Sequence, residues 1–450
     1  MKKFFSYPVY LIIVLSIICS ILFGSLLKYH YAGGKRFQSL QRIGVFFAEI
    51  PFVILNLVQS KSFNPNKPSI LKKHINKQRF KQFIPNKRSG LLVLTKYDHN
   101  LSRSVVDMID LENFETVHTY KHDIAKMNKQ IKNIREYQRI NIDQSPIRFR
   151  YFHPLILEDG SMISHSGSAS IFKVDMCSNL KWFNDKEKFH HSIMLDHEGN
   201  LWTGGHLNPY SKYIKKNRII NNRGKFLDDS VIKLNSDGKI IFNKSVVEIL
   251  IENKILDINV IDISNKFDDP IHLNDIEPAF TNTKYWKKGD VFLSIRNQSS
   301  IVHYRPSTNQ LINYIKGPFS QQHDVDIISP KEISIFNNNN FLIDNEYSEV
   351  IIYNFETNKF KKLFNNQLKK ENFKTLTEGV SHILNDGSLL VEESNHGRII
   401  LFNKDGQKEW EYVNKDIDGN IGVISWVRII EDEIFINKFK KLIENKKCIN

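Results

Sequence analysis

A short β-rich unit recurs along this chain from residue 90 onward. Each copy reads as a first strand, a turn containing Asp-Gly or Glu-Gly, a second strand, a polar turn, a third strand and an edge strand that often carries Trp or Tyr. Long amphipathic helical periodicity is nearly absent from the same region. The clearest copies begin at His153, His191 and His382, and two further copies begin at Gly289 and His323. A chain built from such units is expected to fold as an all-β repeat body.

Repeats of about 40 to 50 residues with four strands each are typical of β-propeller blades, which pack face to face around a central channel. A further blade at residues 90–120 brings the predicted number to six, so we expect a six-bladed β-propeller over residues 88–442. The run SWVRIIEDEIFINKF from Ser425 is expected to supply a strand to the first blade, which closes the ring and removes a free sheet edge. Residues 206–226 and 247–269 are expected to be excursions between strands.

Ahead of the repeats lies an apolar run from Phe4 to Leu27, preceded by Lys2 and Lys3. Its length suits a helix that crosses a bilayer once. No small-residue cleavage site closes the run, which favours an uncleaved signal anchor over a cleaved signal peptide. We therefore expect residues 1–30 to anchor a single-pass protein in the inner membrane.

Two features near the membrane concern the orientation of the body: the basic residues around the apolar run and a second apolar stretch. Basic residues flank both ends of the apolar run, so they do not decide on which side of the membrane the body lies; we take the periplasmic side as the expectation. A second apolar stretch, residues 43–58, is short for a span and contains Glu49 and Pro51. We interpret it as a helix against the membrane or the body, with a hairpin that returns the body to the cytoplasm as the alternative. Residues 31–87 then form a membrane-proximal helix and linker, and residues 443–450 form a tail.

The charge and the cysteines exclude some classes of protein. The net charge is +14, but Lys and Arg are scattered, and no zinc-ligand spacing, RNP-like motif or basic helix accompanies them, so we do not expect nucleic-acid binding. Of the three cysteines, Cys19 lies in the apolar run, and Cys177 and Cys448 are far apart, which argues against a disulfide framework. No paired Cys or Cys/His spacing suggests a structural metal.

Several histidines occupy similar places in the predicted blades. Because inner strands line the channel, residues at one end of each converge on the same mouth. A lone His there is more often a packing or capping residue, but a set of them indicates a site. Arg296 lies on the next strand of one of these blades, and its guanidinium suits an oxyanion. Convergent His and Arg without a carboxylate cluster favour an anion over a divalent metal, although three His would also suit zinc. The histidines are His153, His191, His272, His323 and His382.

Four consecutive motifs surround these residues. They are HLNDI from His272, LSIRNQS from Leu293, GPFSQQHD from Gly317 and ISIFNNN from Ile333. In order and spacing they resemble the motifs of bacterial arylsulfotransferases, although FNNN stands where that family usually has a turn of the F-D-N-G type. The resemblance covers residues 153–412 and is strongest over 271–339. It implies a six-bladed propeller and a sulfotransferase that uses an aryl sulfate directly, without the nucleotide donor 3′-phosphoadenylyl sulfate.

The resemblance also implies roles for individual residues. His323 corresponds to the residue that is transiently sulfurylated, and His272 and Arg296 correspond to groups that bind the sulfuryl oxygens. His191 is expected to be the remaining catalytic histidine, in preference to His190, because it keeps the blade phase. Four further residues are candidates for substrate binding or support: Asn274, His153, His382 and Glu378. No metal and no cofactor is expected.

The predicted activity is a ping-pong sulfotransferase reaction, in which a sulfohistidine at His323 carries the group from an aryl sulfate to a phenolic acceptor. The expected partners are these small molecules and the membrane, not nucleic acid; the sequence leaves the oligomeric state open, a homodimer included. The main alternative is a non-catalytic, membrane-anchored β-propeller that acts as a binding or assembly module. A zinc-dependent or lyase-type propeller enzyme is a third interpretation, and it predicts bound metal.

Overall fold

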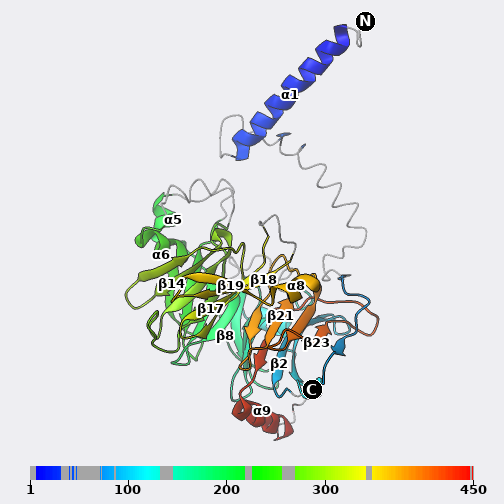
Figure 1. Ribbon diagram of the computed structural model, residues 1–450. Helices are drawn as coiled ribbons and strands as arrows, with labels where there is room; N and C mark the ends of the chain where they lie inside the picture. Colours follow the sequence, from blue (N-terminus) through cyan, green and yellow to red (C-terminus); the bar gives the residue numbers. More distant parts are fainter. Residues whose placement is uncertain are drawn as a thin grey trace.

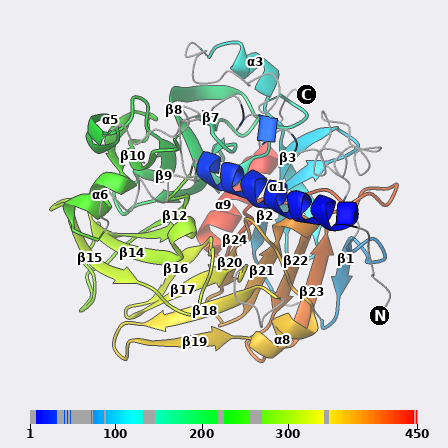
Figure 2. The same cartoon turned by 90° about the horizontal axis from the view of Figure 1, so that it is seen from above.

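The computed structural model describes residues 7–31, 40, 43–44, 47, 71, 73–85, 88–131, 145–217, 226–255, 269–340, 347–445 and 448. These residues form an N-terminal helix and an all-β body with a propeller-like arrangement of sheets (Figures 1 and 2). Most of the predicted helix at 43–58, and parts of the excursions at 206–226 and 247–269, lie outside the described residues.

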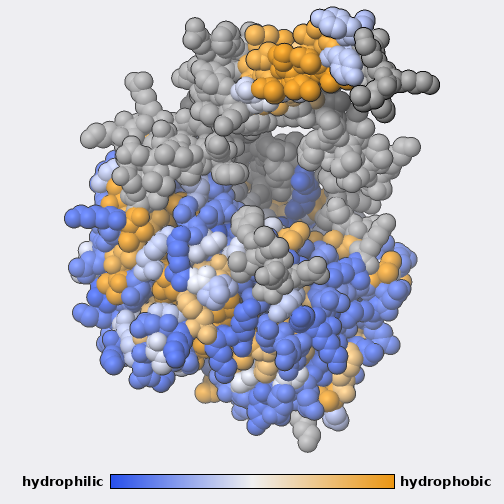
Figure 3. All heavy atoms as spheres, turned by 45° about the horizontal axis from the view of Figure 1, so that its top comes forward, coloured by the Kyte–Doolittle hydropathy of each residue, from blue (hydrophilic) through white to orange (hydrophobic). Residues whose placement is uncertain are grey.

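The N-terminal helix α1 (Tyr7–Tyr31) stands apart from the body (Figure 1). Residues Tyr7–Leu27 are long and apolar enough to cross a bilayer, and none of this stretch is buried inside the protein. Apolar side chains gather on this helix, whereas the body surface in the same view is mostly hydrophilic (Figure 3). A helix of this kind at an N-terminus is a membrane anchor or a signal sequence.

The strands form five antiparallel sheets. The first contains β24 (Arg428–Ile430), β2 (Leu91–Asp98), β3 (Arg103–Asp110) and β4 (Glu115–Tyr120). The second contains β12 (Leu273–Pro278), β13 (Val291–Ile295), β14 (Ser300–Arg305) and β15 (Gln310–Ile315). The third contains β16 (Val325–Ser329), β17 (Glu332–Asn337), β18 (Glu349–Asn354) and β19 (Lys359–Leu363). The fourth contains β20 (Ser381–Ile383), β21 (Leu389–Glu393), β22 (Arg398–Phe402), β23 (Lys408–Val413) and β1 (Phe80–Gln82).

The fifth sheet has seven strands: β5 (Phe152–Ile156), β6 (Met162–His165), β7 (Ala169–Val174), β8 (Leu180–Leu195), β9 (Leu201–His206), β10 (Asp229–Leu234) and β11 (Ile240–Ser245). The sequence predicted six separate blades, and this count is wrong: the structure has four separate blades and one continuous sheet. The physical reason is β8, whose 16 residues are not interrupted by a turn. Its first part pairs with β7 and its second part with β9, so one strand belongs to both halves of the sheet.

The two ends of the body meet in the first sheet. Strand β24 pairs with β2, with Leu91 opposite Ile430, which confirms the predicted closure by the chain ends. Strand β1 adds a fifth strand to the fourth sheet through its pairing with β23, so part of the predicted linker pairs with the body. Because both pairings cover strand edges that would otherwise be exposed, they stabilise the closed arrangement.

Neighbouring sheets pack face to face through apolar side chains. Phe292 and Ile301 of the second sheet share a core with Ile335 and Ile351 of the third. Leu92 of the first sheet packs in the same way in a core with residues of the fourth. These contacts explain why both faces of strands such as β2 and β13 are buried and why the sheets surround a common centre (Figure 2).

Buried carboxylates also tie each sheet to the next. A carboxylate oxygen accepts a hydrogen bond from the backbone N–H of a residue at or near the start of the following first strand, at about 3 Å or less. The pairs are Asp229 with Leu273, Asp275 with Val325, Asp324 with Ser381, and Glu392 with Val427. This repeated contact holds the strand ends that form the candidate site in a fixed relation.

The helices of the body are short, apart from one. They are α3 (Ile124–Asn128), α5 (Lys212–Asn217), α6 (Val246–Glu252), α8 (Asn365–Lys370) and α9 (Glu433–Asn445), together with 3-10 turns η2 (Arg296–Gln298) and η3 (Ser394–His396). Only Arg428–Ile430 of the run predicted to supply the closing strand is a strand; its later residues begin α9, whose Ile436 and Phe439 are buried in one core with Val106 of the first sheet.

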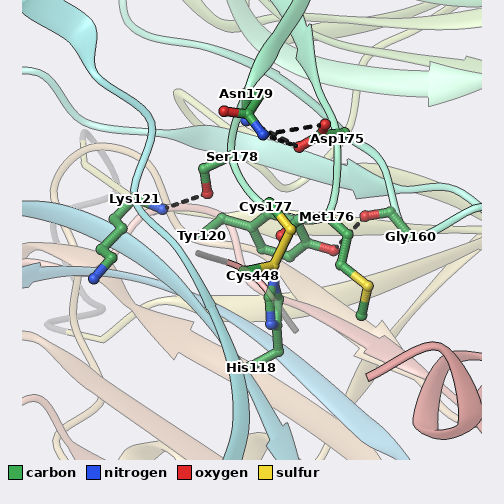
Figure 4. The surroundings of a disulfide bond; sticks show 10 residues. All are labelled: His118, Tyr120, Lys121, Gly160, Asp175, Met176, Cys177, Ser178, Asn179 and Cys448. Carbon is green, nitrogen blue, oxygen red and sulfur yellow. Dashed lines mark hydrogen bonds between the residues drawn. A yellow bond between two sulfur atoms is a disulfide. The ribbon is translucent and has the colours of Figure 1, made fainter. Parts of the chain in front are cut away.

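The residue pair Cys177 and Cys448 forms a disulfide bond, with a Cα–Cα distance of 5.2 Å (Figure 4). The argument against disulfide bonding in this chain is therefore wrong for these two cysteines. They are 271 residues apart in sequence, but α9 brings the C-terminal tail to the turn that joins β7 and β8. Near this turn the phenol of Tyr120 donates a hydrogen bond to the carbonyl of Gly160 at 2.7 Å.

Candidate active site

Three imidazoles from segments of different sheets converge at one place. One ring nitrogen from each of His191, His272 and His323 lies within 4.8 Å of the corresponding atoms of the other two. The ring centroids of His191 lie 5.1 Å from His272 and 6.2 Å from His323. His191 comes from β8, His272 directly precedes β12, and His323 precedes β16. The spacing of the three nitrogens would also fit a metal ion.

A backbone feature repeats at the start of the strands around this cluster. Six non-glycine residues have a left-handed conformation there, at φ values between 40° and 65°. Such residues cost of order 1–3 kcal/mol each and concentrate at functional sites. His323 and His382 do not have this left-handed conformation, unlike the other three predicted histidines. In their two sheets Gln321 and Glu378 have it instead. The six residues are His153, His191, His272, Gln321, Glu378 and Trp426.

His323 is held through both of its ring nitrogens. Its side chain lies in the interior, with 1% of the residue exposed. Nδ1 donates to Oδ1 of Asn338 at 2.6 Å, and Nε2 accepts a hydrogen bond from the backbone N–H of Glu378 at 2.9 Å. Burial, with a smaller contribution from the positive charge of Arg296, lowers the pKa of His323 well below its ordinary value. The imidazole is therefore neutral, with its lone pair on Nε2.

Arg296 lies in η2, directly after β13, and its positive charge acts on His323 of the same cluster. Nη1 donates to Oδ1 of Asn297 at 2.9 Å, and Nη2 donates to Oε1 of Gln321 at 3.1 Å. Its Nε is buried and has no hydrogen-bond partner among the described residues. An unsatisfied buried N–H of this kind is suited to an anionic ligand.

The neighbouring His190 and His191 take different directions. The pairing of β8 with β9 shifts register between His190 and Ile193, and a bulge at this point lets consecutive side chains diverge. The two rings are nearly perpendicular, at 89°, and their Nδ1 atoms are 2.7 Å apart. His191 lies with His272 and His323, whereas His190 turns to Asp229. Burial lowers the pKa of both imidazoles.

His272 is paired with a carboxylate. Its Nδ1 contacts Oδ2 of Asp269, three residues earlier in the chain. This contact places the Nδ1 proton of His272 toward Asp269 and leaves Nε2 as the acceptor nitrogen. The arrangement is the kind that supports a general base.

The four predicted substrate-binding residues lie around this cluster in different settings. Nδ2 of Asn274 donates to the carbonyl of Gln322 at 2.9 Å, so Asn274 holds the backbone next to His323. Glu378 forms an ion pair with Arg150, whose Nη2 is 2.7 Å from Oε1. The ring centroid of His153 lies 5.1 Å from that of Trp426.

The fourth of these residues, His382, lies in β20 and engages the backbone through Nε2, which is 2.8 Å from the carbonyl oxygen of Val427. Burial lowers its pKa to about 4. Substrate binding by His382 and by the other three residues remains a prediction.

Several residues that surround the cluster were not predicted from the sequence. Asn338 lies in the run FNNN, which the motif comparison singled out without assigning it a role. Arg150 brings a second guanidinium close to Glu378, and nothing in its sequence context marked it. Trp426 is buried, with its ring centroid 6.1 Å from His191 and 6.5 Å from His323. Its place at the start of the closing strand was the only available signal.

Comparisons with known proteins add a family match. A family model described as Arylsulfotransferase (ASST) matches residues 153–415. No curated protein matches this chain significantly.

Solved structures give only distant likenesses. A protein of unknown function from Bacteroides caccae is 12% identical at a TM-score of 0.47, covering 77% of this chain and 100% of that one. Hydrazine synthase from Kuenenia stuttgartiensis is 11% identical at a TM-score of 0.39, covering 67% and 71%. Virginiamycin B lyase from Staphylococcus aureus is 11% identical at a TM-score of 0.34, covering 58% and 69%. At these TM-scores the likenesses carry no conclusion about function.

Proposed function

Because this chain belongs to the arylsulfotransferase family, we propose that its body moves a sulfuryl group from an aryl sulfate to a phenolic acceptor by a ping-pong mechanism. The observation that carries the proposal is the convergence of His191, His272 and His323 at one place. Arg296 lies close enough to lower the pKa of His323, so a cation and three imidazoles surround the same space. This set of groups suits a tetrahedral anion.

In the first step His323 is the nucleophile. Oδ1 of Asn338 accepts a hydrogen bond from the Nδ1–H group of His323, which keeps the lone pair of His323 on Nε2. The Nε2 atom forms a bond to sulfur while the bond from sulfur to the aryl oxygen breaks, and that electron pair leaves with the phenolate. Nε2 must first release the backbone N–H of Glu378, which becomes available to a sulfuryl oxygen.

The remaining groups stabilise charge in this step. The Arg296 guanidinium and an N–H of His191 donate hydrogen bonds to the sulfuryl oxygens, because the charge of Arg296 acts on His323 and His191 belongs to the same cluster. The hydrogen-bond partners of the Arg296 guanidinium are neutral amides, and the charge of Asp269 acts on it without a direct ion pair among the described residues.

In the second step the acceptor phenol attacks sulfur. Its proton passes to Nε2 of His272, whose Nδ1 contacts Asp269, and the electron pair of the breaking N–S bond returns to Nε2 of His323. His272 is the general base of this step, because its carboxylate partner stabilises the imidazolium that forms.

We further propose that the body lies on the periplasmic side of the inner membrane, anchored by an uncleaved α1. The Cys177–Cys448 disulfide supports this side, because disulfides persist in oxidising compartments and are rare in the cytosol. Protease added to intact spheroplasts tests it: digestion of the body supports the periplasmic side, and protection until the cells are lysed contradicts it.

The test of activity is turnover of a chromogenic aryl sulfate with an added phenol and no nucleotide. We expect sulfated acceptor and covalent labelling by the aryl sulfate with the wild-type protein, and neither transfer nor labelling of the protein in the His323→Ala variant. Full activity of that variant would exclude His323 as the nucleophile. No transfer with a panel of phenols would favour the non-catalytic binding or assembly module.

A further inference from the structure

A second cluster lies directly behind the three imidazoles. Nε2 of His190 and Nε2 of His206 are each 3.1 Å from the same oxygen, Oδ1 of Asp229. These three ligand atoms all lie within 4.8 Å of one another. Neither His206 nor Asp229 belongs to the motifs that indicated the sulfuryl-transfer site, so the proposed function leaves this cluster unexplained.

Strand pairing brings the three residues together. His206 ends β9 and lies opposite Asp229, the first residue of β10, while His190 lies opposite Gly204 on the other side of β9. A Cβ atom at Gly204 would lie 2.9 Å from Cε1 of His190, so only glycine leaves room for this imidazole. The run TGGH from Thr203 therefore supplies one ligand and the space for another.

Hydrogen bonding within the protein does not satisfy this cluster. Asp229 uses Oδ2 to accept the backbone N–H of Leu273 at 3.0 Å. Its Oδ1, although close to two imidazoles, accepts no well-directed hydrogen bond from the described residues, and Nε2 of His190 makes none. His190 and Asp229 are 3% and 1% exposed, so neither of these atoms has access to bulk water. Buried polar atoms without partners are rare, and a bound ion is one recognised reason for them.

The distances match those in a metal site. With ligand bonds of about 2.0–2.2 Å and tetrahedral angles, ligand atoms lie about 3.3–3.6 Å apart. The two contacts of 3.1 Å are close to this edge length. Two imidazoles with one carboxylate form a ligand set that suits zinc and related divalent transition metals.

We propose that His190 Nε2, His206 Nε2 and Asp229 Oδ1 bind one divalent transition-metal ion of the zinc type. The site is separate from the proposed sulfuryl-transfer cluster and does not depend on that activity. It also accounts for the contact behind His191: a metal on Nε2 of His190 leaves Nδ1 as its N–H donor, 2.7 Å from Nδ1 of His191. The ion would then orient His191 with its proton on Nε2, directed away from His190.

Metal content of the full-length protein in detergent tests the proposal. The protein is stripped with EDTA, incubated with zinc sulfate, passed through a desalting column and analysed for zinc. We expect about one zinc per chain for the wild type, and at least a tenfold loss for both Asp229→Asn and His206→Ala. Asp229→Asn keeps the shape of the side chain, and circular dichroism verifies that each variant is folded.

The matched control is His272→Ala, which removes a member of the neighbouring histidine cluster and none of the proposed ligands. Zinc retained in this variant and lost in the other two supports the proposal. Zinc lost in His272→Ala but retained in Asp229→Asn would place the ion among His191, His272 and His323 and overturn it, as would a wild type without zinc. If the variants misfold, the wild type loaded with Co²⁺ decides: histidine ligands give hyperfine-shifted imidazole resonances from two rings, and their absence overturns the site. None of these measurements uses sulfuryl transfer, so the two proposals fail independently.

Discussion

The substitution Asn338→Asp is a direct test of how His323 is activated. Oδ1 of Asn338 accepts a hydrogen bond from the Nδ1–H group of His323 at 2.6 Å, and both side chains are buried. The pKa of His323 lies well below its ordinary value because of burial and the charge of Arg296. Wild-type kcat/KM should therefore show no acid limb from this group between pH 6 and pH 8.

A carboxylate at position 338 stabilises the protonated imidazole. Opposite charges about 4 Å apart interact with about 4 kcal/mol at an effective dielectric constant of 20, which corresponds to about three pKa units. The new carboxylate would also face the carbonyl oxygens of Thr375 and Glu378, which now accept from Nδ2 of Asn338, and this raises its own pKa. We therefore expect the pKa of His323 to rise, but by less than the charge interaction alone would give.

The assay is the pH dependence of kcat/KM for a chromogenic aryl sulfate, measured from pH 5 to pH 9. The nucleophile is active only when neutral, so a raised pKa moves the acid limb toward higher pH and leaves the rate at pH 9 less affected. Asn338→Ala serves as the comparison, because it removes the acceptor without adding charge. It should lower the rate at every pH by about 10- to 100-fold, the equivalent of about 1–3 kcal/mol for an unsatisfied buried N–H. An unshifted profile in active Asn338→Asp, or full activity of Asn338→Ala, would refute this account.

Three further outcomes follow from other contacts. Arg296→Lys should lower kcat/KM by about 10- to 100-fold in the same assay, because lysine cannot present two parallel N–H donors to a sulfuryl group; an unchanged value would remove Arg296 from the site. Cys448→Ser should lower the free energy of unfolding by about 2–5 kcal/mol, since the disulfide closes a loop across 271 residues; the control Cys19→Ser should leave the denaturant midpoint unchanged, and equal effects would contradict the reasoning. Burial raises the pKa of Asp275 and Asp326 to about 7 in the folded protein, so the folded state binds more protons than the unfolded state. Their contribution to the free energy of unfolding is present below pH 4 and is lost as pH rises through 7. The contribution is measured as the difference in urea midpoint between the wild type and the Asp275→Asn and Asp326→Asn variants, and a contribution that grows between pH 6 and pH 8 would contradict the prediction.

Some structural features could be predicted from the sequence because they depend on local patterns. The spacing of short strands and Asp-Gly turns predicts an all-β repeat body, and the apolar run at the N-terminus predicts α1. Pairing of β24 with β2 was also predictable, since a ring of repeats leaves an unpaired edge at each chain end. The number of blades was not, because nothing in the sequence of β8 distinguishes one long strand from two.

The candidate site divides in the same way. His272, Arg296 and His323 stand in motifs that can be recognised one at a time, so the sequence was enough to name them. Their relation to Asn338 and to the backbone of Glu378 depends on how successive strand ends meet, and strand periodicity carries no information about that.

By itself, the sequence determined that the body is a β-rich repeat, where the apolar N-terminal helix lies and which histidines stand in recognisable motifs, because these properties follow from patterns a few residues long. Only the tertiary structure decided that His190 turns away from His191 to join His206 and Asp229, and that Cys177 meets Cys448. Both results depend on a strand bulge and on ring closure, which bring together residues far apart in the chain. Such contacts are set by packing of the whole body and not by the sequence around each residue.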